Sequence, residues 1–143
     1  MMKRFSFPLD RVLDWKSVVA QQEQLTLDSL HSERAEITAS LLNLSSQIDN
    51  LSEHAQSAES GHELAYSAQA RSALVRQRTK TEAKQASCDT RIVSQQHRLR
   101  AAETERLLID KLKTRSLTQW TSEASREMEA TASDLFLGGW NRR

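Results

Sequence analysis

A heptad repeat without glycine or proline runs from Leu9 to Ala58 and constrains the fold of this chain more than any other feature. Its a positions hold Leu13, Ala20, Leu27, Arg34, Leu41, Ile48 and Ala55. Its d positions hold Leu9, Lys16, Glu23, Leu30, Ile37, Leu44, Leu51 and Ala58. Twelve of these fifteen side chains are apolar, and helices supercoil when apolar residues recur every 3.5 positions. The repeat therefore predicts one long amphipathic helix that packs against another helix.

The composition favours an all-α fold for the whole chain. Aromatic residues make up 5% of the 143 residues, and there are only three glycines and one proline to form turns. No apolar run is long enough to cross a membrane. The residues after Lys3 and Arg4 are not the apolar core of a secretory signal, so we expect none. The single cysteine, Cys88, is expected to be a small buried side chain.

A turn near Gly61 is predicted to divide the chain into two helices. Gly61 is the first glycine in the sequence, and a Ser-Gly pair can end a helix in the left-handed conformation. We expect a single coiled-coil hairpin over residues 1–143, with a first helix at about 8–59 and a turn at about 60–63. The second helix is expected at about 64–135, followed by a frayed tail at 136–143. Glu59, His62 and Glu63 gather at the turn, where we predict solvated side chains and no metal site.

The second helix is expected to be longer than the first. When the chain folds back at Gly61, Leu9 lies opposite about residue 113, which leaves a helical overhang of about 30 Å. Apolar residues of the second helix keep the 3.5-residue spacing from Leu74 to Ile109, and the phase then slips near Leu112. Such a slip is a stutter, which locally unwinds a supercoil. Beyond it the line continues at steps of three and four through Leu117, Trp120, Ala124, Met128, Thr131 and Leu135.

Opposite net charges favour the pairing of the two helices. Residues 1–60 hold five basic and nine acidic side chains, whereas residues 61–143 hold fifteen basic and ten acidic ones. Oppositely charged flanks set the register and direction of a coiled coil. We therefore expect the acidic first helix to lie against the basic second one.

The open end of the predicted hairpin differs from the end near the turn. Its seam is polar, with Lys16 and Glu23 on the first helix and with Gln95, Arg106 and a candidate position at Lys113 on the second. This end should therefore open more easily. Trp15 falls at a c position outside the seam, beside Val12 and Val19. Either the overhang or Phe5 and Phe7 cover this tryptophan, or it is an anchor for a partner, as tryptophan often is at interfaces. Residues 135–140 likewise form either a frayed tail or an apolar hook for a partner.

Residues 5–16 at the start of the chain read FSFPLDRVLDWK and have the form F-x-F-x-L-x-x-V-L-x-x-K. This motif resembles the FliJ family of flagellar type III export proteins. Residues 106–113, RLLIDKLK, also resemble the second helix of that family. The resemblance implies a cytosolic antiparallel coiled coil, similar to the central stalk of rotary ATPases and peripheral at the inner face of the cell membrane. It implies three partners, namely a hexameric export ATPase, the cytoplasmic domain of the export gate protein, and export chaperones that the chain escorts.

The resemblance also suggests where those partners bind. Contacts to the ATPase ring are expected at the open end, through Val12, Trp15, Lys16, Val19 and Trp120. Contacts to the export gate are expected just after the turn, through Tyr66, Ala70 and Leu74. An asymmetric stalk touches the subunits of a ring unequally, and can thereby bias which subunit binds or hydrolyses nucleotide. Flagellar and virulence secretion systems both remain open.

Enzymatic activity is not expected. The four histidines are scattered, and the sequence has no Gly-rich phosphate loop, HExxH or CxxC motif, so we predict no catalytic residues and no cofactor.

Residues 71–115 hold twelve basic and five acidic side chains, and a basic helix can follow a phosphate backbone. No aromatic residues interleave with them to stack on bases, so we do not expect nucleic acid as a partner. A nucleic-acid-binding coiled coil and a passive scaffold are the alternatives.

Overall fold

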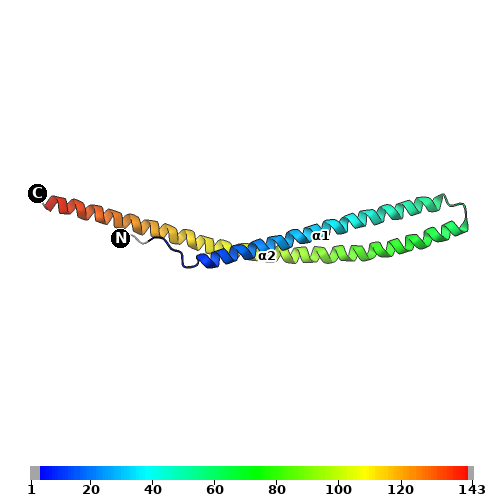
Figure 1. Ribbon diagram of the computed structural model, residues 1–143, viewed down its shortest axis with the longest axis horizontal. Coiled ribbons are helices and arrows are strands. Elements are labelled where there is room, and N and C mark those ends of the chain that lie inside the picture. Colours follow the sequence, from blue (N-terminus) through cyan, green and yellow to red (C-terminus); the bar gives the residue numbers. More distant parts are fainter. Residues whose placement is uncertain (1–3, 142–143) are drawn as a thin grey trace. The chain divides into compact units, whose positions relative to one another are not determined.

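The computed structural model describes residues 4–141, which form an all-α helical hairpin of two helices (Figure 1). Helix α1 spans Asp10–Gln56 and helix α2 spans Gly61–Asn141. The predicted fold class is thus confirmed. Tertiary contacts divide the helices into two units. The turn unit contains Gln22–Leu99, and the end unit contains the described residues up to Gln21 and from Arg100 onward.

The turn unit holds the apolar core that the heptad repeat predicts. Leu27, Cys88 and Ile92 form a buried cluster between the two helices. Leu30, Ile37 and Leu99 pack against this cluster and are partly buried. In this unit every predicted a and d side chain of α1 is buried or half-buried, which confirms the predicted register. Full burial of a Leu or Ile side chain contributes about 1.5–3 kcal/mol, so these contacts dominate the stability of the unit.

Cys88 is fully buried, as the sequence predicts. Its thiol Sγ lies 3.6 Å from the carbonyl oxygen of Leu30, to which it donates a weak hydrogen bond across the two helices. The small side chain lets the helices approach closely at this level. Cys88 therefore belongs to the packing of the turn unit.

The turn is built differently from the sequence prediction. α1 ends at Gln56, about three residues early, and Gly61 is the first residue of α2. None of the glycines in residues 4–141 has a positive φ, so Gly61 does not end α1 in the left-handed conformation. Instead, Ser57 ends α1 by donating from its N–H and from its hydroxyl to the carbonyl oxygen of His54, at 3.2 and 3.1 Å.

Ser60 and Glu63 start α2 in place of the glycine. The backbone N–H of Glu63 donates to the hydroxyl oxygen of Ser60 at 3.2 Å. The Glu63 carboxylate in turn accepts from the backbone N–H of Glu59, also at 3.2 Å. This is a variant of the capping box, in which a Ser and a Glu three residues later satisfy free N–H groups of the first helical turn. The Glu63 carboxylate is thereby used in capping.

The end unit pairs the first turns of α1 with a much longer stretch of α2. Ala102 is buried there, and further inward-facing side chains of α2 are half-buried at steps of three and four residues. These are Arg106, Ile109, Lys113, Ser116 and Trp120. The predicted phase slip near Leu112 is therefore not followed in the packing against α1. Leu112 and Leu117 remain 45% and 43% exposed, whereas the half-buried Lys113 lies at the seam and pairs with Asp10.

Beyond the start of α1, α2 continues as the predicted overhang. Every side chain from 125 to 140 is exposed. The helix runs to Asn141, six residues past its predicted end at 135. Residues 136–141, which were predicted to belong to a frayed tail, are helical instead. They contain no proline that would interrupt the backbone hydrogen bonds of the helix. Residues 142–143 of that predicted tail lie outside the described residues. Neither described helix combines the length and the apolar character that crossing a membrane requires.

Candidate partner-binding surfaces

The segment before α1 packs onto α2 in the end unit. Phe7 is buried, and its carbonyl oxygen accepts a 3.1 Å hydrogen bond from the backbone N–H of Asp10. The ring of Phe5 lies against Trp120, with 5.9 Å between centroids and 58° between ring planes. Such a tilted aromatic pair stabilises by about 0.5–1.5 kcal/mol beyond its buried area. Trp120, a predicted ATPase contact, is therefore half-buried by the chain's own N-terminal segment.

Trp15 is the exposed residue of the predicted ATPase-binding set on α1. Its spacing from Val12, Lys16 and Val19 puts all four side chains on one side of the helix. The valines are half-buried, whereas Trp15 is 59% exposed. Phe5, offered with Phe7 as a cover for this ring, packs against Trp120 instead. The structure thus leaves Trp15 open to solvent.

Lys16 fixes the surroundings of Trp15. Its Nζ lies 4.6 Å from the centroid of the Trp15 ring and 2.7 Å from Oε2 of Glu105 on α2. The first contact is a cation–π interaction and the second is an ion pair. Because one ammonium group holds both partners, the indole ring is oriented before any other protein arrives. A side chain that is already ordered loses less entropy when it binds.

A second ion pair marks the start of α1. Lys113 Nζ lies 2.7 Å from Oδ1 of Asp10 in the first turn of the helix. The hydrogen bond to Asp10 raises the pKa of Lys113 above its ordinary value of 10.5, and the nearby Asp10, Asp14 and Asp110 charges act in the same direction. Lys113 was a candidate polar seam position of the second helix, and the structure shows Asp10 as its partner.

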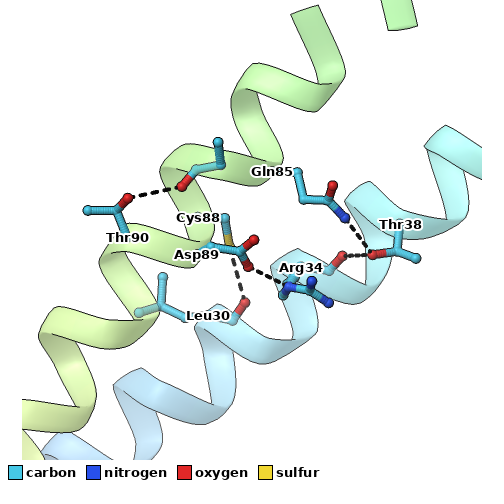
Figure 2. A network of polar contacts seen from close by, with 8 residues as sticks. Leu30, Arg34, Thr38, Gln85, Cys88, Asp89 and Thr90 are labelled. Atoms are coloured by element: carbon cyan, nitrogen blue, oxygen red, sulfur yellow. Dashed lines mark hydrogen bonds and ion pairs between the residues drawn. The ribbon is translucent and has the colours of Figure 1, made fainter. Parts of the chain in front are cut away.

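The turn unit carries polar contacts across its seam as well (Figure 2). Arg34 at an a position of α1 pairs with Asp89 of α2 at 2.5 Å. Its carbonyl oxygen accepts a 2.9 Å hydrogen bond from the Thr38 hydroxyl, and Thr38 Oγ1 in turn accepts from Gln85 of α2 at 3.4 Å. Figure 2 shows these side chains meeting between the helices beside Cys88. Arg34, which interrupts the apolar repeat, is therefore paired rather than left alone.

Glu23 and Gln95 form another polar layer of the turn unit. Gln95 is 6% exposed, and its Nε2 donates to the carbonyl oxygen of Glu23 at 3.1 Å and to the Glu23 carboxylate. Both residues were predicted as polar seam positions that weaken the open end. The structure shows that they satisfy each other, as buried polar groups must.

Cross-helix ion pairs only partly follow the net charges of the two helices. Among the described residues, two pairs put the acid on α1, through Asp10 and Glu33. The other two put the acid on α2, through Asp89 and Glu105. In the first group, the hydrogen bond to Glu33 raises the pKa of Arg91. Individual side chains, rather than the overall charge of each helix, therefore determine which residues pair.

The three residues predicted to contact the export gate do not share one exposed surface. Tyr66 is 72% exposed near the start of α2. Ala70 and Leu74 are half-buried instead, since they continue the inward-facing line that begins with the buried Ser67. Only Tyr66 is therefore freely presented to a partner, and gate binding stays a prediction.

In comparisons with known proteins, the chain matches no protein-family model, no curated protein and no solved structure. Among residues 4–141, no three His, Cys, Asp or Glu side chains are grouped so that they could hold a metal ion. The candidate surface that stands out is therefore the Trp15 face of the end unit.

Proposed function

We propose that this chain is a cytoplasmic component of a type III protein export system of the flagellar kind, where it acts as the stalk of a hexameric export ATPase. The observation that carries the proposal is Trp15, an exposed and pre-oriented aromatic side chain. It lies within residues 5–16, the segment that resembles the FliJ family. Tryptophan at the centre of an interface is often a main source of binding energy.

The proposed mechanism uses the asymmetry of the end unit. In a ring of similar subunits, each subunit presents the same surface to the stalk. Trp15, in contrast, lies on one side of α1 only. The subunit that meets Trp15 makes contacts that the others lack, so its nucleotide affinity changes relative to theirs. A ligand can shift an equilibrium only through such a difference in affinity. Lys16 lies over the indole ring of Trp15, and the half-buried Val12 and Val19 lie on the same side of α1.

The other proposed partners are the cytoplasmic domain of the export gate protein and the export chaperones that the chain escorts. Tyr66, exposed in the turn unit, is the proposed main gate contact. Through these partners the chain would be peripheral to the inner face of the cell membrane. The escort role rests on the family resemblance alone.

The test is the ATPase rate of the cognate hexameric export ATPase, titrated with the full chain. We expect stimulation that saturates near one chain per hexamer, and Trp15→Ala should need about tenfold or more protein for half-maximal stimulation. Leu25→Ala is the matched control, because Leu25 is 67% exposed on the same helix but lies in the turn unit. Absence of stimulation by the unaltered chain, or equal loss in both variants, would overturn the proposal.

A further inference from the structure

The overhang of α2 carries an apolar stripe that is largely exposed. Leu117, Ala124, Met128 and Leu135 recur at helical spacing. Ala124 is half-buried, whereas Leu117, Met128 and Leu135 are 43%, 61% and 73% exposed. At 1.5 Å per residue the stripe is about 27 Å long. Near its C-terminal end, Leu135, Phe136, Gly139 and Trp140 line a shallow surface hollow. We call Leu117, Ala124, Met128 and Leu135 the overhang stripe.

A row of carboxylates runs along one edge of the overhang stripe. The line of α2 that faces α1 passes through Ser116 and Trp120. One heptad further, the same line reaches Glu123 and Glu127, and then Asp134. The side chains of all three are exposed, and none forms an ion pair with any of residues 4–141. A helix packed on the overhang stripe would therefore have this acidic row at its flank.

The charge of α2 changes sign near the level at which α1 begins. Residues 98–115 hold six basic and three acidic side chains, whereas residues 116–141 hold four acidic side chains and only one basic one. Asp10, the first residue of α1, pairs with Lys113 just before this change. The overhang is thus acidic as well as apolar, while the part of α2 paired with α1 in the end unit is basic.

We propose that the overhang stripe binds an amphipathic helix of another protein whose apolar face is edged by Lys and Arg. Residues that flank a helix–helix seam select the partner through their charges. Two copies of the overhang would bring their acidic rows together, which disfavours pairing of the overhangs. Phosphates of an anionic membrane or a nucleic acid would meet the same repulsion. The inference does not rest on the proposed ATPase function.

The test compares two synthetic helical peptides of about 21 residues, which is three heptads. Both carry the same Leu and Ile seam, with Lys flanks in one peptide and Glu flanks in the other. The full chain is titrated with each by isothermal calorimetry. We expect the Lys-flanked peptide to bind about tenfold more tightly or better. The triple variant Glu123→Lys, Glu127→Lys, Asp134→Lys should reverse this preference.

A matched control separates the acidic row from net charge. Glu36→Lys, Asp49→Lys, Glu53→Lys changes three exposed acidic side chains of α1 by the same total charge. This control should keep the preference for the Lys-flanked peptide. Met128→Ser, Leu135→Ser should lose binding of that peptide without losing helix content by circular dichroism, since both side chains are exposed.

Three results would overturn the proposal. The first is equal affinity for the two peptides, or the same loss of preference in the α1 control. The second is a dimer in analytical ultracentrifugation that Met128→Ser dissociates, because a second copy would then cover the stripe. The third is binding to vesicles of anionic phospholipid that the triple variant leaves unchanged.

Discussion

The two units of this chain use the same two helices but are stabilised differently. In the turn unit, Leu27, Cys88 and Ile92 form a buried apolar cluster. In the end unit, the inward-facing positions include Lys16, Arg106 and Lys113, and two of these are held by ion pairs. Partly exposed ion pairs contribute little compared with buried apolar area. The comparison indicates that the turn unit supplies most of the stability, and that the end unit presents surfaces to partners.

The largest expected effect tests the apolar core of the turn unit. Ile92→Ala removes three carbon atoms from a side chain that is only 7% exposed, so we expect a loss of about 2–4 kcal/mol in the free energy of unfolding. Urea unfolding followed by circular dichroism measures it. Leu112→Ala in the end unit is the control and should cost below about 1 kcal/mol, because Leu112 is 45% exposed. Equal losses would remove the distinction between the units.

A smaller effect is expected at the polar layer of Glu23 and Gln95. Gln95→Ala leaves the inward-facing Glu23 carboxylate without its side-chain donor, which should cost about 1–3 kcal/mol. The double variant Glu23→Leu, Gln95→Leu should recover that loss or exceed the stability of the original, since an apolar layer replaces a paired polar one. Urea midpoints of the three proteins measure this. A double variant less stable than Gln95→Ala would show that the layer is a source of stability in its own right.

The smallest effect concerns the ion pair at the start of α1. Because the folded pKa of Lys113 is raised, its contribution is complete below the unfolded value of 10.5 and is lost as pH rises through the folded value. The unaltered chain should therefore lose slightly more thermal stability between about pH 9 and about pH 11.5 than Lys113→Met does. Thermal melts of both proteins at the two pH values test this. An equal drop would mean that the pair contributes nothing to folding.

The sequence predicts the fold well because a coiled coil repeats one rule. Leu27, Leu44 and Ile48 are buried where the heptad places them, and Trp15 is exposed because a c position points away from the partner helix. The start of α2 could also have been predicted, since Ser60 and Glu63 have the spacing of a capping box.

The heptad repeat does not predict every contact in the structure. Phe5 meets Trp120 across more than a hundred residues, and no repeat relates an irregular segment to a helix. Leu112 and Leu117 suggest a phase slip, but Lys113 lies on the inner side instead and pairs with Asp10. For a similar reason, the three predicted gate residues are not exposed together. Tyr66 points outward, whereas Ala70 and Leu74 follow the packing of α1.

Because Cys88 is buried, the reactivity of its thiol measures how often the two helices separate around it. Cys88 is the only cysteine in the sequence, and its side chain has no exposed surface in the folded turn unit. A thiol reagent can reach it only when the two helices separate at that level. The rate at which the unaltered protein is alkylated therefore measures how often the turn unit opens, without any introduced label. A partner that clamps the helices together would slow that reaction, and one that separates them would speed it.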